Sequence, residues 1–274
     1  MSSQVSHRAR KRFGQHFLVD PVIVQQIVQV IHPKAGDHLV EIGPGLGVLT
    51  ELLVPHVWQL DAVELDRDII PKLKNKLRSF NNLQIHSADA LTFDFCELMQ
   101  QSAKPQQPLR VVGNLPYNIS TPLIFHLIEQ IECIADLHFM LQKEVVDRMV
   151  AQPNHSAYGK LSVMLQYHCQ AEKCFDVPPS AFSPPPKVES SVVRLIPHQQ
   201  PPVAVGCFAD FSSLVSAAFA QRRKTLRNNL KGMLSESQIT AANIDPQRRA
   251  ETLSLQEFAA LSHLISSQVG REPD

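Results

Sequence analysis

Two patterns of apolar residues alternate over the first 200 positions of this chain. Short apolar stretches, typical of buried strands, occupy residues 38–42, 58–63, 83–85, 109–113 and 137–141. Apolar residues at helical spacing occupy residues 21–31, 46–55, 66–77, 120–131, 142–150 and 158–170. Strands that alternate with helices indicate a parallel sheet covered by helices on both faces. We therefore predict an α/β fold, completed by strands at residues 173–177 and 190–196.

The pattern changes near residues 197–202, which contain three prolines. Beyond this stretch, apolar spacing predicts only helices, at residues 208–220, 224–234, 238–242 and 255–267. We therefore divide the chain into an α/β domain over residues 1–200 and a small helical domain over residues 201–274. Residues 1–12 are expected to form a flexible basic arm at the start of the first domain.

A glycine turn follows the strand at residues 38–42 and contains Gly43, Gly45 and Gly47. Glycine lets a ligand approach the main chain closely, so strand, turn and helix together indicate a nucleotide-type site. The spacing G-x-G-x-G departs from the dinucleotide fingerprint G-x-G-x-x-G, because position 48 is Val48. This departure favours a cofactor that lacks a phosphate.

Two acids follow the next strands of the predicted sheet. Glu64 ends the strand at residues 58–63, where a carboxylate can accept hydrogen bonds from ribose hydroxyls, and Asp89 follows the strand at 83–85. A phosphate would repel these acids, whereas a sulfonium or an adenine amine would attract them. The pattern therefore favours S-adenosylmethionine over NAD as the cofactor.

The strand at residues 109–113 leads into Asn114-Leu115-Pro116-Tyr117. In an open parallel sheet, ligands bind outside the carboxyl ends of the strands, so Asn114 is expected beside the glycine turn. Its side-chain oxygen and a main-chain carbonyl held outward by Pro116 could accept hydrogen bonds from the amine of an adenine, while Tyr117 stacks on the base. In isolation, the tetrapeptide could also be an ordinary proline turn. Phe182, in the proline-rich loop at residues 177–188, could be a core residue or the second wall of a base pocket.

The chain carries no net charge, with 26 Lys and Arg against 26 Asp and Glu, so any basic surface must be local. Clustered cations occur at both ends and could form a solvated face or contact phosphates. The residues that we predict to contact RNA are Arg10, Lys11, Arg12, Arg222, Arg223, Lys224 and Arg227. The second cluster is expected at the start of a helix, where the dipole does not favour cations, which makes phosphate contact more plausible.

Other features of the sequence bound the class of protein. The five cysteines show no C-x-x-C pair, so we expect reduced thiols in a cytoplasmic protein. The twelve histidines show no paired ligand spacing, and we predict no metal. No apolar run reaches the roughly 18 residues of a membrane span, and no signal-type apolar core follows the basic N-terminus.

Taken together, these motifs resemble the bacterial small-subunit ribosomal RNA adenine dimethyltransferases over nearly the whole chain. The matching stretches are residues 11–18 (KRFGQHFL), 41–45 (EIGPG), 64–66 (ELD), Asp89, 114–120 (NLPYNIS), 182–188 (FSPPPKV) and 221–224 (QRRK). The resemblance implies a Rossmann-like class I methyltransferase that uses S-adenosylmethionine. It also implies dimethylation of N6 of two adjacent adenosines in the 3′-terminal hairpin of 16S rRNA, within an immature 30S subunit, by a monomeric enzyme.

The resemblance assigns roles to individual positions. It implies cofactor contacts for Leu18, Gly43, Glu64, Asp89 and Asn114, with Asp89 on the adenine amine of the cofactor. His16, where relatives often have Asn, would contact the cofactor through its main chain. The positions that match the target-base site are Asn114, Tyr117 and Phe182.

Three other functions remain open. A sister group with similar motifs methylates 23S rRNA and confers macrolide resistance, although it resembles this chain less closely. A small-molecule methyltransferase would share the sheet and the glycine turn but would not need two cation clusters. The chain could also act chiefly as a non-catalytic assembly factor of the small subunit.

Overall fold

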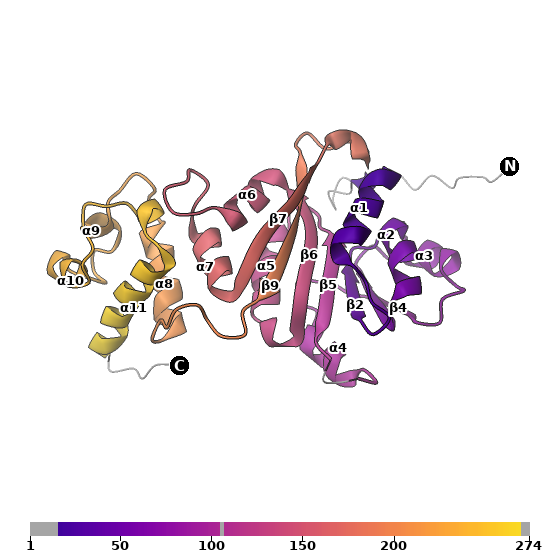
Figure 1. Ribbon diagram of the computed structural model, residues 1–274, viewed down its shortest axis with the longest axis horizontal. Coiled ribbons are helices and arrows are strands. Elements are labelled where there is room, and N and C mark those ends of the chain that lie inside the picture. The colour runs from indigo at the N-terminus through magenta and orange to yellow at the C-terminus, as the bar shows by residue number, and fades with distance from the viewer. Residues whose placement is uncertain (1–15, 105–106, 270–274) are drawn as a thin grey trace. The chain divides into compact units, whose positions relative to one another are not determined.

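A computed structural model of the chain describes residues 16–104 and 107–269 (Figure 1). The described residues divide into two compact units, one within Met1–Val146 and Glu172–Pro197 and the other within Asp147–Ala171 and His198–Asp274. The arm predicted at residues 1–12 lies outside the described residues. No helix among the described residues is both long and apolar enough to span a lipid bilayer.

A mixed sheet of seven strands forms the centre of the fold. From one edge to the other the strands are β4 (Leu83–Ser87), β3 (Gln59–Glu64), β2 (His38–Ile42), β5 (Leu109–Asn114), β6 (Ile134–Gln142), β9 (Ser190–Pro197) and β7 (Cys169–Val177). The strands from β4 to β6 are parallel, whereas β9 is antiparallel to β6. The strand order reverses between β2 and β5, and this is the point at which ligands bind in open α/β sheets. The predicted α/β fold is confirmed.

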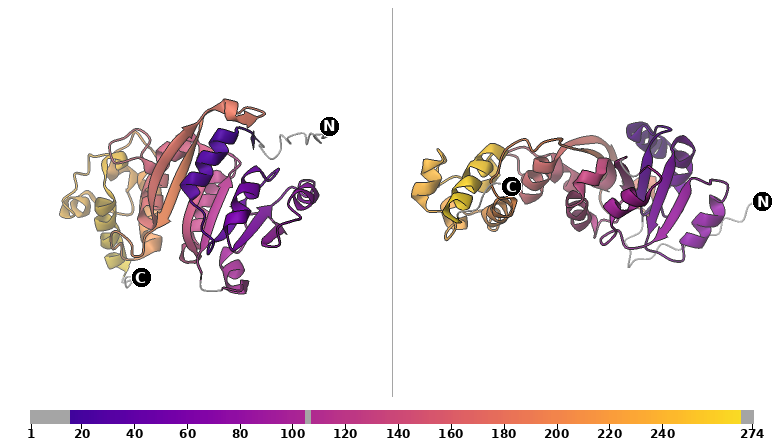
Figure 2. Two further views of the ribbon diagram at one scale, coloured as in Figure 1. Left: turned by 45° about the vertical axis from the view of Figure 1, so that its right-hand side comes forward. Right: turned by 90° about the horizontal axis from the view of Figure 1, so that it is seen from below.

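Helices cover both faces of this sheet (Figure 2). Those of the first unit are α1 (Pro21–Ile31), α2 (Val48–Leu53), α3 (Ile70–Lys76), α4 (Phe95–Gln101) and α5 (Ser120–Ile128). The helix α1 begins where predicted, because the Asp20 carboxylate accepts hydrogen bonds from the main-chain N–H groups of Val22 and Ile23. Its buried residues Val24 and Ile27 belong to an apolar core that also contains side chains of β2, β5 and β6.

A short two-stranded sheet lies next to this core. It pairs β1 (Phe17–Leu18) with β8 (Phe182–Ser183) in antiparallel fashion, with Leu18 opposite Phe182. The main-chain N–H of Val19 also donates to the carbonyl of Ala181 at 2.9 Å. The segment that precedes α1 is therefore attached to the proline-rich loop, although Leu18 and Phe182 are 164 positions apart in the chain.

The second unit is helical. The helix α6 (Lys143–Val150) extends into it from the first unit, and the others are α7 (Lys160–His168), α8 (Phe208–Ala218), α9 (Leu226–Asn229), α10 (Glu236–Ala241) and α11 (Leu255–Val269). Aromatic contacts explain why residues 147–171 belong to the second unit and not, as predicted, to the first domain. The ring centroid of Tyr167 lies 5.5 Å from that of Phe208 and 5.1 Å from that of Phe211. These contacts join α7 to α8.

The helix predicted over residues 224–234 is much shorter in the structure. Thr225 is the N-cap of α9, and residues 221–224 form a turn between α8 and α9. Arg222, Arg223 and Lys224 therefore precede the helix, whereas Arg227 lies in its first turn. The first N–H groups of α9 are bonded to a distant segment, because Leu226 N donates to the carbonyl of Arg248 and Arg227 N to that of Pro246.

The prediction of reduced thiols is wrong for one pair, because Cys96 and Cys133 form a disulfide. Cys96 lies on α4 and Cys133 on the 3₁₀ helix η3 (Ile131–Cys133). These two elements meet because the Gln130 side chain accepts hydrogen bonds from the main-chain N–H groups of Phe95 and Cys96. Local spacing could not predict a pair separated by 37 residues.

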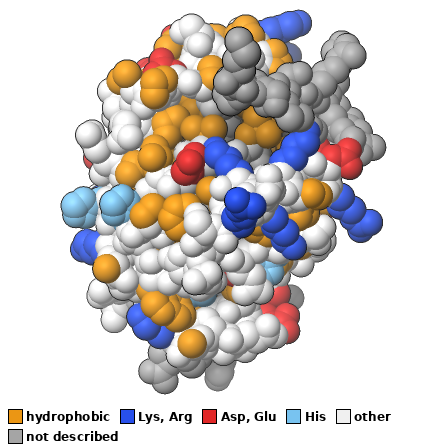
Figure 3. Space-filling model, turned by 90° about the vertical axis from the view of Figure 1, so that its right-hand side faces the viewer, with side chains coloured by type: hydrophobic (Ala, Val, Ile, Leu, Met, Phe, Trp, Pro, Cys, Tyr) orange, Lys and Arg blue, Asp and Glu red, His pale blue; other side chains and the backbone are white. Residues whose placement is uncertain are grey.

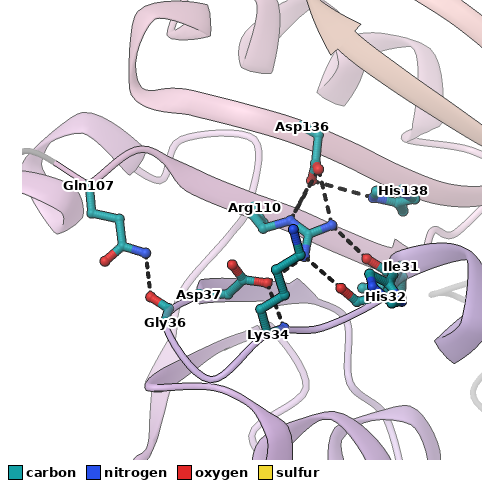
Figure 4. A network of polar contacts seen from close by, with 9 residues as sticks. All are labelled: Ile31, His32, Lys34, Gly36, Asp37, Gln107, Arg110, Asp136 and His138. Atoms are coloured by element: carbon teal, nitrogen blue, oxygen red, sulfur yellow. Dashed lines mark hydrogen bonds and ion pairs between the residues drawn. The ribbon is translucent and has the colours of Figure 1, made fainter.

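A partly buried arginine joins several elements at the amino end of the sheet (Figure 4). Arg110 on β5 donates to the carboxylates of Asp37 at 2.5 Å and Asp136 at 3.0 Å, and to the main-chain carbonyl of Ile31 at 2.6 Å. The ion pair with Arg110 and the contact with His138 keep the pKa of Asp136 below its usual range, against the effect of burial. One side chain thus joins the end of α1 to β5 and β6.

We predict that Arg110→Met lowers the free energy of unfolding by up to about 3–5 kcal/mol, because the change leaves two partly buried carboxylates without their cation. Urea unfolding followed by far-UV circular dichroism measures the loss. Arg78→Met, at an exposed position, is the control and should change stability by at most about 0.5 kcal/mol. Equal stability of the two variants would contradict this account of the network.

Candidate active site

A cavity of ≈ 270 Å³ opens at the carboxyl ends of β2, β3 and β5. Its lining is largely apolar and includes every residue predicted to contact the cofactor: His16, Leu18, Gly43, Glu64, Asp89 and Asn114. Tyr117 also lines it. Such a cavity, apolar with a few polar groups that converge on it, is typical of a small-molecule site. The structure thus brings these residues together, while their roles stay predictions.

The glycine turn forms one wall of the cavity. Gly43 has a φ of 66° and its N–H donates to the carbonyl of Val63, so the turn is fixed to β3. Gly47 has a φ of 73°, and a Cβ atom there would lie 2.5 Å from a methyl group of Leu73. Gly43 requires glycine because of its backbone conformation. Gly47 requires it both for its conformation and because a side chain would clash with Leu73.

Glu64 is held beside this turn. Its carboxylate accepts hydrogen bonds from the main-chain N–H groups of Asp66 at 2.8 Å and Gly45 at 3.3 Å. Burial raises the pKa of Glu64, and these hydrogen bonds oppose the shift. The carboxylate of Asp89 is fixed in a similar way, by the N–H of Leu91 at 3.0 Å. Two acids with defined positions therefore face the cavity.

Asn114 ends β5 with its side-chain amide oriented. Its Nδ2 donates to the main-chain carbonyl of His16 at 3.1 Å, which leaves Oδ1 as the outward acceptor. No side-chain or main-chain group of the described residues donates to this oxygen. The predicted role of Asn114 as an acceptor for an amine N–H stays a prediction.

Tyr117 lies beside Asn114 with its phenol engaged. Its Oη is hydrogen-bonded to Ser190 Oγ at 2.7 Å, and burial raises the pKa of Tyr117 so that it stays protonated. The His16 ring stacks on the Tyr117 ring, with centroids 5.7 Å apart and planes inclined by 27°. The Nδ1 of His16 donates to the carbonyl of Pro184 at 2.7 Å.

Phe182 does not form the second wall of this pocket. It is 4% exposed and packs in the apolar core with Leu18, Val177 and Ala181, and it is absent from the cavity lining. The reason is the pairing of β8 with β1, which directs Phe182 inward and leaves Ser183 exposed. Of the two possibilities open from the sequence, the structure shows the core residue.

Several polar lining residues received no role in the sequence analysis, and two of them are deeply buried on central strands. Glu41 on β2 is 2% exposed, and His138 on β6 is 3% exposed. Burial raises the pKa of Glu41 to about 7. An acid between apolar neighbours, two positions before the glycine turn, was the available signal for Glu41; the sequence offered none for His138.

The predicted RNA-contact residues differ in their surroundings. Arg10, Lys11 and Arg12 lie outside the described residues. In the second unit, Arg222 donates to the carbonyl of Ser156 and lies 3.6 Å from Glu251, and Arg227 lies 3.7 Å from Glu236.

Arg223 and Lys224 are exposed in the turn, and neither has an acidic partner among residues 16–104 and 107–269. Of the four cations in this cluster, these two are the most available to phosphates. Both belong to the second unit.

A further run of exposed cations follows Glu64 and was not singled out from the sequence. It consists of Arg67, Lys72, Lys74, Lys76 and Arg78, on and around α3. Figure 3 shows the side of the molecule on which α3 lies, where Lys and Arg side chains gather among hydrophobic ones. Lys76 is engaged with Glu51 at 2.9 Å and with the carbonyl of Leu46 at 3.2 Å, so it supports the glycine turn.

One group of metal-ligand types lies close together among the described residues, at Cys96, Glu132 and Cys133. Its two sulfur atoms are bonded to each other in the disulfide. This group is not part of the cavity lining.

Comparison with known proteins identifies the family. The sequence model of a family described as ribosomal RNA adenine dimethylase matches residues 6–267. The chain belongs to the ribosomal RNA adenine dimethylase family.

Relatives within this family are similar over nearly their full lengths. The chain is 55% identical to the ribosomal RNA small subunit methyltransferase A of Saccharophagus degradans, over 94% of this chain and 95% of the relative. It is 52% identical to the protein of the same name from Chromohalobacter salexigens, over 95% of this chain and 93% of the relative.

Solved structures agree with the fold. A dimethyladenosine transferase from Plasmodium falciparum has a TM-score of 0.77 at 28% identity, over 94% of this chain and 100% of that one. The 23S rRNA methyltransferase ErmE has a TM-score of 0.71 at 22% identity, over 91% and 99%, and shows the fold alone.

As a ribosomal RNA adenine dimethylase, the chain is a methyltransferase that uses S-adenosylmethionine, as predicted. The cavity fits this cofactor. Its glycine turn admits close approach of a ligand to the main chain, and Glu64 and Asp89 offer acceptors for hydroxyl and amine donors.

We predict that Gly113→Ala in this dimethylase weakens both folding and cofactor binding. A Cβ atom at Gly113 would lie 2.6 Å from the main-chain oxygen of Ile42, in the strand paired with β5. The clash has to separate β2 from β5, and the cost should be about 1–3 kcal/mol in urea unfolding. Titration calorimetry should show a larger dissociation constant for S-adenosylmethionine. Gly36→Ala, with no atom within 4 Å, is the control, and equal effects of the two changes would contradict the prediction.

Proposed function

We propose that this enzyme methylates N6 of two adjacent adenosines in the 3′-terminal hairpin of 16S rRNA, placing two methyl groups on each. Its substrate would be a late assembly intermediate of the 30S subunit. The observation that carries the proposal is the placement of the oriented Asn114 amide and the Tyr117 ring in the cavity that also contains Glu64 and Asp89. The names of relatives at 52–55% identity, small subunit methyltransferase A, support the choice of RNA.

The proposed chemistry rests on positioning. The lone pair of the adenine amine is delocalised into the ring, so the nitrogen attacks poorly until it becomes tetrahedral. S-adenosylmethionine supplies an electrophilic methyl group on a positively charged sulfur. Asn114 Oδ1 and the main-chain carbonyl before Pro116 would accept hydrogen bonds from the amine and so favour the transition state, in which positive charge develops on nitrogen. The nitrogen gains the methyl group and loses one proton to solvent, and a second round uses a second cofactor molecule.

Tyr117 would hold the base flat. Its hydroxyl, fixed by Ser190, sets the plane of the ring against which a splayed-out adenine can stack. The His16 ring stacks directly on Tyr117 and covers one of its faces. Residues of the first unit would thus carry catalysis, and the helical second unit would contribute to rRNA binding. The enzyme would act as a monomer in the cytoplasm, without a metal.

The alternatives have less support. A 23S rRNA substrate rests on a similarity to ErmE at 22% identity, which bears on the fold alone. A purely non-catalytic assembly role would not require an oriented acceptor in the cofactor cavity. The small-subunit assignment therefore remains the better one.

Methyl transfer to under-methylated small subunits, to large subunits and to protein-free RNA, measured side by side, tests the proposal. We expect labelled methyl groups only in the small subunits, as N6,N6-dimethyladenosine. Incorporation into 23S rRNA would overturn it.

In the same assay, Asn114→Ala should reduce turnover about 10²–10³-fold or more with subunit binding retained, because it removes the acceptor at the reacting amine. Asn75→Ala, on the exposed side of α3, is the control, and unchanged turnover by Asn114→Ala would remove the mechanism.

We predict that Arg223→Ala combined with Lys224→Ala weakens binding to the small subunit and lowers the slope of log K against log salt by roughly 1–2, as expected for two lost phosphate contacts. Filter binding at several salt concentrations measures both quantities. The matched control is Lys34→Ala combined with Lys104→Ala, which removes the same charge from exposed positions before β2 and after α4. If both double variants bind alike, the turn at residues 221–224 is not an RNA contact.

A further inference from the structure

The buried carboxyl of Glu41 has no assigned role in the reaction. It lies on β2, two positions before Gly43, and lines the cavity with only 2% of its surface exposed. Its Oε2 atom has no hydrogen-bond partner among the described residues. A buried carboxylate is costly without a compensating cation or donor, so its ionised form requires a partner.

The groups that face Glu41, which include a hydrogen bond from the Thr50 hydroxyl, offset the cost of its negative charge only in part. Burial raises the pKa of Glu41 to about 7, and the negative charge of Glu64 on β3 adds to the rise. The Thr50 hydroxyl on α2 and the ammonium of Lys76 on α3 act in the opposite direction. Lys76, however, is 39% exposed and is already paired with Glu51 on the outer side of the glycine turn.

The cavity as a whole is acidic. Besides Glu41, the carboxyl groups that line it are those of Glu64, Asp66 and Asp89, and none of the described lining residues is Lys or Arg. The lining also contains His16 and His138. A ligand that brings a positive charge would be stabilised here, whereas a neutral or negative one would not.

We propose that Glu41 provides the negative charge that stabilises the sulfonium of S-adenosylmethionine, and that binding of this positive charge displaces a proton from the Glu41 carboxyl group. The inference concerns cofactor binding and holds whichever RNA is the substrate. It distinguishes the cofactor from its product, because methyl transfer turns the sulfonium into the neutral thioether of S-adenosylhomocysteine. Glu41 would then favour the reactant and weaken retention of the product.

The dependence on pH follows from linkage. In the free protein the pKa of Glu41 is about 7, and a bound cation lowers it. Binding of S-adenosylmethionine therefore releases a proton below pH 7, and its affinity rises with pH until Glu41 is already ionised in the free protein. S-adenosylhomocysteine lacks the sulfonium and should release no proton from this group. The ratio of the two affinities should rise about tenfold between about pH 6 and about pH 8.

Calorimetry on the full chain without RNA tests the proposal. Each ligand is titrated in two buffers of different ionisation enthalpy, which gives the number of protons released. For S-adenosylmethionine we expect nearly one proton at about pH 6 and close to none at about pH 8. Absence of proton release at the lower pH, or equal release with both ligands, would overturn the proposal in the unaltered protein.

Two variants test whether Glu41 is the group that releases the proton when S-adenosylmethionine binds. Glu41→Gln, which preserves shape, should abolish the release and make the ratio of affinities independent of pH. Glu129→Gln removes one negative charge from an exposed position outside the cavity lining and should change neither quantity. Release that persists in Glu41→Gln would assign the proton to another group, such as Glu64 or His138, and the proposal would fail. Because no RNA is present, this outcome is separate from any failure of the proposed substrate.

Discussion

The contact between β2 and β5 is the constraint on which the site depends. The two strands are neighbours in the sheet although their sequences lie about seventy positions apart, and Ile42 pairs with Gly113 at their carboxyl ends. This pairing places the glycine turn, which follows β2, next to Asn114, which ends β5. A side chain larger than hydrogen at Gly113 would meet the main chain of β2. The closeness of the glycine turn and Asn114 is thus set by the pairing of the two strands.

Charge is distributed in opposite ways within the molecule. The cavity contains carboxyl groups and no Lys or Arg among its described lining residues, while the exposed surface carries runs of cations on α3 and in the turn before α9. Such a separation suits an enzyme that has a cationic small ligand inside and a polyanionic one outside. It also explains how a chain of zero net charge can bind a cationic ligand and a polyanionic one. The negative charge of the cavity and the positive charge of the surface cancel in the sum but act in different places.

The parts of this fold that the sequence predicted are those set by neighbouring residues. The limits of α1 follow from a capping Asp20, a proline and regular apolar spacing, and all of these are local. The glycine turn, Glu64 and Asn114 could be placed because the ends of parallel strands meet at one edge of a sheet. Phe182 could not be placed, since its direction is set by pairing with Leu18, far away in the chain. Distant contacts also determine that residues 147–171 belong to the second unit, through aromatic contacts with α8, and that Cys96 forms a disulfide with Cys133. Neither could be predicted from neighbouring residues.

His16 connects three parts of the first unit at once. Its main-chain carbonyl fixes the Asn114 amide, its ring covers Tyr117, and its Nδ1 is bonded to the carbonyl of Pro184. Opening one of these contacts by moving the segment before α1 would loosen the other two. Access to the Tyr117 ring and the orientation of the Asn114 amide are therefore coupled through a single residue, and the amide keeps this orientation only while His16 keeps its position.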